Sequence, residues 1–307
     1  MIEGEADCLV QQSPGSCPRG GGNWGRRLLG RVAATERLGS MVRLALHVPG
    51  WRGARAGQFA LLQPEPSRCF LARAFSVCDE AGETVSFLIA PVGEGTRELS
   101  SLSVGAGVWV LGPLGNGFDV DGLVRSLDRT VVVAGGVGLA PFPLLLAQMA
   151  VRCRDLYPHP AGAGPGTATA AGPEVLVLLG FRDLEQARGA EVMRQAAKRA
   201  EGAGLRLTLE IATEDGSHGN AGRVTDLLED HLRSGDRLAV CGPELMASAV
   251  WQVCSRIPRV QVWFNLEGNM ACGVGSCHGC VVKMADGSYA RVCHEGPVFS
   301  GSEVFGG

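Results

Sequence analysis

The sequence predicts a multidomain β plus α/β protein: an antiparallel β-barrel, a parallel sheet with helices on both faces, and a small C-terminal domain rich in cysteine. Three observations support this order. Short apolar runs fill residues 29–119, strands and helices alternate over residues 120–258, and four cysteines cluster within residues 259–307. The 307 residues, 46% of them hydrophobic, are enough for two or three domains of ordinary size.

Composition excludes some classes of partner. The net charge is −3 and aromatics make up 6%, so we expect neither nucleic acid nor a membrane surface as partner. No run of about eighteen apolar residues and no signal peptide is present, so we expect a cytoplasmic protein without a transmembrane helix. Thiols stay reduced there, and the odd number of eleven cysteines favours metal ligands over a disulfide framework.

The first part of the chain predicts a barrel. Residues 1–28 are rich in Gly, Ser and Pro and predict a disordered leader. Short β-like runs follow at residues 30–38, 41–48, 57–63, 73–79, 84–90 and 107–113. Turn residues separate these runs at short intervals, which is typical of a small antiparallel barrel or sandwich. One helix, predicted at residues 95–102, interrupts them.

The middle of the chain changes pattern at Thr130. Apolar strands are predicted at residues 129–136, 174–181, 205–212 and 236–243, and helices at 139–153, 184–200, 223–232 and 244–254. Alternating helices and apolar strands indicate a parallel sheet covered on both faces. Residues 157–173 are of low complexity and predict a flexible surface insertion.

The C-terminal cysteines have the spacing C-x4-C-x2-C-x12-C. They are Cys272, Cys277, Cys280 and Cys293. This is the plant-type [2Fe–2S] pattern, in which two irons need four thiolates. Gly273, Gly275 and Gly279 let the loop curl around a cluster and point N–H groups at its sulfurs.

Two other metal centres fit this spacing less well. Zinc ribbons pair two C-x2-C knuckles, and only one knuckle is present here. A Rieske centre needs two histidine ligands, but His278 and His294 directly follow cysteines and lack the C-x-H spacing.

A glycine-rich turn predicts a dinucleotide site. GGVGLAP, residues 135–141, follows an apolar strand and opens a helix, where a pyrophosphate can approach the backbone. It is not a strict G-x-G-x-x-G, because Pro141 takes the third glycine's place. CGP, residues 241–243, ends a later strand of the same sheet, so Cys241 is expected near the nicotinamide as the candidate catalytic residue. The alternative for Cys241 is a buried thiol at a strand end.

Two barrel segments predict a second phosphate site. RAFS, residues 73–76, begins a strand, and GEGT, residues 93–96, opens the one helix. An arginine and a helix N-terminus together neutralise a pyrophosphate. The alternative is a salt-bridging arginine and an ordinary capped helix.

The order of these motifs, with GPLGNGF at residues 112–118 and LEGNMACGVGSCHGC at 266–280, resembles the ferredoxin–NADP reductase superfamily. Within it, the chain is most similar to the electron-transfer subunits of class 1B dihydroorotate dehydrogenases, over about residues 30–300. The resemblance implies an FAD-binding β-barrel, a nicotinamide-binding parallel-sheet domain and a C-terminal [2Fe–2S] domain. It also implies an FMN-containing catalytic partner that oxidises dihydroorotate to orotate in pyrimidine (UMP) biosynthesis, in a heterotetramer with two of each subunit.

The resemblance implies a role for each matched residue. The expected FAD contacts are Arg73, Ala74, Phe75, Ser76, Leu88, Ile89, Ala90, Gly95 and Thr96. The expected NAD(H) contacts are Gly136, Gly138 and Pro141, and the four cysteines of the C-terminal loop ligate the cluster. Glu267 is either a flavin-side carboxylate or a solvated acid. Ala74 departs from the family, which has proline there; the change loses rigidity but no hydrogen-bond donor.

Two alternative functions remain open at this stage. The chain can instead be the reductase subunit of another system, such as an NADH-dependent ferredoxin–NADP oxidoreductase or a sulfide dehydrogenase; cysteine at all four cluster positions favours the dihydroorotate branch. The other class is a non-enzymatic zinc-binding regulatory module, which would need neither the flavin motif nor the dinucleotide turn. Arg182 leaves NADPH possible, and the resemblance favours NADH.

Overall fold

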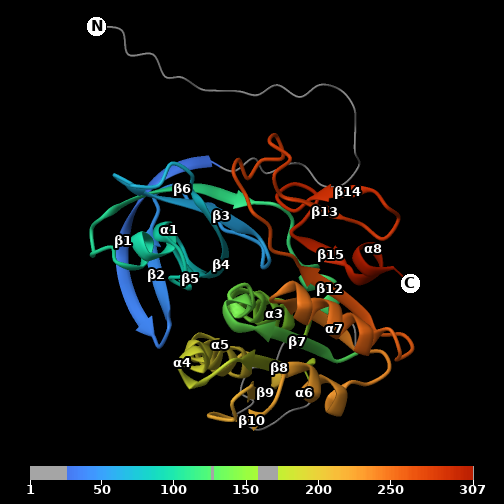
Figure 1. The fold of residues 1–307 in the computed structure, drawn as a ribbon. Helices are drawn as coiled ribbons and strands as arrows, with labels where there is room; N and C mark the ends of the chain where they lie inside the picture. The colour runs from blue at the N-terminus through green and yellow to red at the C-terminus, as the bar shows by residue number, and fades with distance from the viewer. Residues whose placement is uncertain (1–25, 126–127, 158–171, 307) are drawn as a thin grey trace, which may run out of the picture.

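The computed structural model describes residues 26–125, 128–157 and 172–306. Most of the predicted leader (1–28) and most of the predicted insertion (157–173) lie outside these residues. Figure 1 shows the barrel and the sheet as separate bodies, with the C-terminal segment in red beside both of them. The predicted combination of barrel, α/β domain and C-terminal domain is confirmed.

Six antiparallel strands form a closed barrel in the order β1-β2-β5-β4-β3-β6. They are β1 (Arg26–Leu38), β2 (Met41–His47), β3 (Phe59–Glu65), β4 (Arg73–Ala81), β5 (Thr84–Ile89) and β6 (Gly107–Leu114). Side chains alternate across each strand, so every second residue of β2 fills the interior, and Leu44 and Leu46 are completely buried. Helix α1 (Glu94–Ser100) follows β5, as the sequence predicts.

Seven strands form the second sheet in the order β10-β9-β8-β7-β11-β12-β15. They are β7 (Thr130–Gly135), β8 (Glu174–Phe181), β9 (Arg206–Thr213), β10 (Asn220–Ala221), β11 (Arg237–Cys241), β12 (Gln261–Asn265) and β15 (Val298–Ser300). Only β15 runs antiparallel to its neighbour. The chain reverses its winding direction between β7 and β11, and ligands of open α/β sheets bind at such a switch point.

Helices cover both faces of this sheet (Figure 1). They are α2 (Val120–Arg125), η1 (Gly136–Leu139), α3 (Phe142–Leu156), α4 (Leu184–Ala187), η2 (Arg188–Ala190), α5 (Glu191–Glu201), α6 (Val224–His231) and α7 (Glu244–Cys254). Helices α3 and α5 pack on one face, with Val132 and Val177, while α6 and α7 pack on the other, with Val131 and Val133.

The segment Gly136–Leu156 is long and apolar enough to span a membrane, but 67% of its most apolar stretch is buried inside the protein. It is therefore explained as the core helix of the α/β domain. The predicted helix 184–200 is broken into α4, η2 and α5. A side chain at Gly189 would lie 2.7 Å from Met41 Sδ, so the break lets this segment approach the barrel closely.

The last fifty residues join both bodies. The hairpin β13 (Val281–Lys283) and β14 (Tyr289–Arg291) precedes β15, and α8 (Gly301–Phe305) ends the described chain. Strands β12 and β15 belong to the large sheet although they follow residue 259, so the predicted boundary there separates segments that share a sheet and stays a prediction. Asn116 fastens the barrel to this region: its side chain donates to Glu295 O (2.6 Å) and accepts from Val298 N (3.1 Å).

Candidate functional site

The cysteine loop, residues 272–280, turns tightly because two of its glycines adopt the left-handed backbone conformation. Gly273 has φ 69° and Gly275 has φ 82°, a region that favours glycine. A Cβ on Gly273 would lie 2.8 Å from Leu61 Cδ1, and one on Gly275 would lie 3.0 Å from His294 Cδ2. The loop thus packs tightly on barrel strand β3 on one side and on the segment after β14 on the other.

Backbone N–H groups of this loop point at the four sulfurs. Cys272 Sγ accepts from Val274 N (3.5 Å) and Cys277 N (3.4 Å), Cys277 Sγ from Gly279 N (3.5 Å), Cys280 Sγ from Cys293 N (3.4 Å), and Cys293 Sγ from Gly275 N (3.1 Å). Donors aimed at sulfur stabilise thiolate, which is the form that binds iron. This array is what cluster ligation requires.

The environment shifts the pKa of two of the four thiols in opposite directions. Burial acts to raise the pKa of Cys272, but hydrogen bonds from Val274 and Cys277 outweigh it and lower that pKa to about 7. Burial, with the hydrogen bond to Cys280, raises the pKa of Cys293 to about 12. Among the described residues, no three His, Cys, Asp or Glu side chains could hold a single metal ion. Ligation of a cluster by these four cysteines stays a prediction.

The predicted FAD phosphate site brings β4 and α1 together. Arg73 begins β4, and its guanidinium lies so close to Gly95 in α1 that a Cβ there would be 2.9 Å from Nε. Only Nη1 of Arg73 has hydrogen-bond partners among the described residues, chiefly Leu71 O at 2.7 Å. Thr96 Oγ1 accepts from Gly93 N (2.9 Å) and so orders the start of α1. The two remaining nitrogens of the guanidinium suit a diphosphate.

The other predicted FAD residues line the same barrel wall. Ala74, Phe75 and Ser76 are half-buried on β4, next to Arg73. Leu88 and Ile89 are buried in the barrel core at the end of β5, and Ala90 lines a large cavity. Their contacts with FAD stay predictions.

This cavity, of about 940 Å³, opens between the barrel and the carboxyl ends of the sheet strands. Six of its lining residues show its extent: Met41, Ala90, Gly136, Arg182, Glu214 and Glu267. It is large enough for a dinucleotide. Gly136 has φ 55°, and no atom lies within 4 Å of where its Cβ would be. A pyrophosphate can therefore approach the backbone there, as the glycine-rich turn predicts.

Gly138, Pro141 and Cys241 are not on the cavity wall. A Cβ on Gly138 would lie 2.5 Å from Cys241 O, so this glycine holds η1 tightly against the end of β11. Pro141 is the residue before α3 and begins that helix. Burial, and then the nearby charge of Glu267, raises the pKa of the Cys241 thiol well above its usual range, so Cys241 stays a neutral S–H donor.

Sequence reasoning left Glu267 ambiguous and missed Glu214. Glu267 lines the cavity, and the residue as a whole is exposed to solvent. Protein atoms around its carboxyl group nevertheless desolvate that group, which raises the pKa of Glu267. Glu214 follows β9, and its carboxylate has no hydrogen bond or ion pair within the part of the chain that the structure describes. The neighbouring Asp215 instead holds the turn, because its Oδ1 accepts from Ser217 N (2.9 Å) and Oγ (2.6 Å). The signal for Glu214 in the sequence was an acidic residue just after a strand of the parallel sheet, where ligands of such sheets bind.

Three features together define a class of protein. They are an antiparallel barrel with an arginine beside a helix start, a dinucleotide-sized cavity at the switch point of a parallel sheet, and a four-cysteine segment. The protein is a flavin- and nicotinamide-linked reductase with an iron–sulfur domain. Two family profiles agree: residues 132–252 match the oxidoreductase NAD-binding domain, and residues 267–305 match the iron–sulfur cluster binding domain of dihydroorotate dehydrogenase B.

Relatives of known name identify the family. The electron transfer subunit of dihydroorotate dehydrogenase B (NAD(+)) from Clostridium perfringens is 33% identical, over 81% of this chain and 86% of that protein. The subunit of the same name from Listeria monocytogenes is 32% identical, over 89% of this chain and 96% of that protein. The chain belongs to the family of dihydroorotate dehydrogenase B electron transfer subunits.

Solved structures share the fold. A chain of the NADH-dependent reduced ferredoxin–NADP oxidoreductase superimposes with a TM-score of 0.72 and 23% identity, covering 90% of this chain and 89% of that one. A ferredoxin–NADP⁺ reductase from Neisseria gonorrhoeae, solved with bound FAD and NADP, gives 0.59 and 16% identity, covering 78% of this chain and 99% of that one. The predicted reductase fold is confirmed.

Proposed function

We propose that this chain is the electron-transfer subunit that links an FMN-containing dihydroorotate dehydrogenase catalytic subunit to NAD, by way of a [2Fe–2S] cluster and FAD, in pyrimidine (UMP) biosynthesis. One observation carries the proposal. The cysteine loop packs directly on barrel strand β3, next to the strand that begins with Arg73, and the dinucleotide cavity is lined both by barrel residues and by Glu267, just before this loop. When bound, FAD and the cluster supply exchange between hydride transfer and single-electron transfer.

The chain's own residues position these groups. Arg73 and Gly95 hold the FAD diphosphate, and Ala74 to Ser76 with Leu88 to Ala90 form the wall beside the flavin. Gly136 gives the NAD pyrophosphate access to the backbone, and Gly138 and Pro141 fix the turn and the helix behind it. Cys241 lies at the strand end next to this turn, where burial keeps its thiol protonated. Cys280 and Cys293 are buried, Cys272 is partly exposed and Cys277 is exposed.

The finer points of this function rest on the family. We infer a heterotetramer with two of each subunit in the cytoplasm, with domains over residues 29–119, 120–258 and 259–307. NAD(H) is favoured over NADP(H), because the unpaired carboxylate of Glu214 suits a ribose diol and repels a 2′-phosphate.

A second candidate is supported by the superposition with the NADH-dependent reduced ferredoxin–NADP oxidoreductase chain. In that case a different catalytic partner would receive the electrons, while the flavin, dinucleotide and cluster sites keep their roles. Reconstitution separates the two: dihydroorotate-dependent NAD⁺ reduction should appear only when an FMN-containing dihydroorotate dehydrogenase subunit is added.

The first test is an ultraviolet–visible spectrum of the anaerobically purified chain before and after NADH. We expect flavin bands with broader iron–sulfur absorption, both bleached by NADH. Flavin without iron would mean cluster loss or a zinc-filled site, which metal analysis distinguishes. A colourless, zinc-loaded protein would refute the proposal in favour of a regulatory zinc module. Full dihydroorotate oxidation by the isolated chain would refute the division of labour between subunits.

A further inference from the structure

The side chain of Phe70 is 95% exposed, more than any other large hydrophobic residue in the described ranges. It lies in the loop between β3 and β4, and the next residue, Leu71, is 42% exposed. A pair of adjacent apolar side chains in water is costly, and a fully exposed phenylalanine is a typical anchor of a protein interface. No contact within the described chain explains this position.

The loop that carries Phe70 is held firmly in place. Gln63 Nε2 donates to Cys69 O (3.0 Å) and Phe70 O (3.1 Å). At the base of the loop, the Glu98 carboxylate accepts from Ser67 Oγ (2.9 Å) and Arg68 N (2.8 Å). The phenyl ring is therefore presented by a fixed backbone rather than by a loose segment, which lowers the entropy lost on binding.

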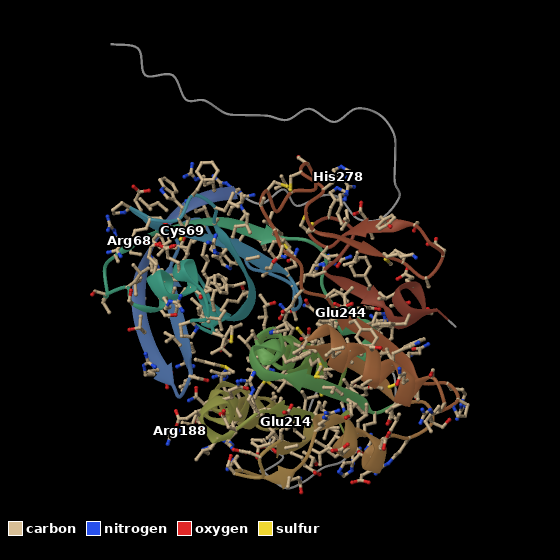
Figure 2. The ribbon with its side chains drawn as sticks, viewed as in Figure 1. Arg68, Cys69, Arg188, Glu214, Glu244 and His278 are labelled. Atoms are coloured by element: carbon tan, nitrogen blue, oxygen red, sulfur yellow. The ribbon has the colours of Figure 1, made fainter. Side chains whose placement is uncertain are left out.

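The Phe70 loop and the cysteine loop leave the same barrel strand. Leu61 of β3 packs against Gly273 of the cysteine loop, and Gln63 lies two residues further along β3, about 7 Å away on the same face. Ala72, at the end of the Phe70 loop, and Met270, at the start of the cysteine loop, pack against one apolar cluster. Figure 2 shows Cys69 on the barrel and His278 at the top of the C-terminal segment, both in the upper half of the view and above the large sheet.

The cysteine loop also exposes its tip. Residues 276–279 are exposed, Cys277 among them, and Val281 just beyond is 42% exposed. We name the surface made of Phe70, Leu71, Cys277, His278 and Val281 the Phe70 face. It combines a fixed aromatic anchor with the only exposed cluster ligand in the described chain.

We propose that the Phe70 face is the docking surface for the FMN-containing catalytic subunit, with the Phe70 ring seated in an apolar pocket of that subunit. The proposal rests on the proposed function. Electrons exchanged with another protein must pass where the cluster is accessible, and Cys277 is that point. A second copy of this chain on the same surface would cover the cluster without bringing it to an FMN, so the catalytic subunit is the occupant.

The test uses the full-length chain and the FMN-containing dihydroorotate dehydrogenase subunit of the same genome, with titration calorimetry for binding. Phe70→Glu should weaken binding about 30-fold or more, the effect of losing one interface hot spot. Val104→Glu is the matched control: Val104 is 69% exposed on a different barrel loop, between α1 and β6, and its variant should bind like wild type. NADH-dependent reduction of ferricyanide needs no partner and should be unchanged in both variants.

Three results would overturn the docking site. In the first, Phe70→Glu binds the catalytic subunit within threefold of wild type. In the second, Val104→Glu weakens binding as much as Phe70→Glu does. In the third, Phe70→Glu loses FAD on purification, which would mean that the ring covers the flavin nucleotide. A wild-type chain that NADH bleaches but that binds no such subunit would overturn both the docking site and the proposed partner. Failure of the bleaching itself would overturn the proposed function alone.

Discussion

Gly138→Ala tests how the nicotinamide site is built. The added Cβ would lie 2.5 Å from Cys241 O, 2.7 Å from Cys241 C and 2.7 Å from Gly242 Cα. Carbon atoms in contact normally stay about 3.5–4.0 Å apart, so η1 and the end of β11 must separate by about 1 Å. All three neighbours are backbone atoms and cannot rotate away. Such overpacking costs about 1–3 kcal/mol.

The assay for Gly138→Ala is calorimetric melting, with NADH kinetics in parallel. A loss of about 2 kcal/mol lowers the melting temperature of the α/β domain by about 4–8 °C. KM for NADH should rise because the turn that carries Gly136 moves with η1. Gly202→Ala is the control, since its Cβ would meet nothing closer than 3.4 Å at a helix end and should be neutral. Wild-type stability and KM in Gly138→Ala would refute this account of the site.

Four further changes test other parts of the structure. Cys277→Ser should abolish the iron–sulfur absorption and keep the flavin bands, whereas Cys69→Ser, outside the cysteine loop, should keep both; equal loss in the two variants would count against the assigned ligand. Arg73→Ala should weaken FAD binding by about 10- to 100-fold, measured by the fluorescence of released flavin, because charge-assisted hydrogen bonds contribute about 1.5–3 kcal/mol. Asp236→Asn should cost about 3–5 kcal/mol in urea unfolding, since it removes the buried charge partner 2.6 Å from the Arg129 guanidinium and leaves only Glu174, 3.7 Å away and partly exposed; a cost under about 1 kcal/mol would contradict this. Glu214→Arg should raise kcat/KM for NADPH relative to NADH about tenfold or more in ferricyanide assays, and an unchanged ratio would remove Glu214 from the ribose site.

Local patterns predicted most of the fold. The six barrel runs and the alternating strands and helices were visible because burial imposes a period on contiguous residues. The bounds were less well predicted: β1 begins at Arg26, inside the expected leader, and the helix expected over 184–200 is broken at Gly189. That break depends on a close approach to Met41 of the barrel, which no periodicity within the helix reveals.

The sequence by itself determined the prediction of four cluster thiols and of the glycine-rich turn, because both depend on spacing within one short segment. Only the tertiary structure decided that Gly138 packs against β11 while Gly136 faces open space, and that Glu214 and Ala90 line one cavity. It also decided that the Phe70 loop and the cysteine loop both pack on strand β3. Each of these features needs contacts between segments that are far apart in the sequence. Such contacts are set by the packing of the whole chain rather than by any local sequence pattern.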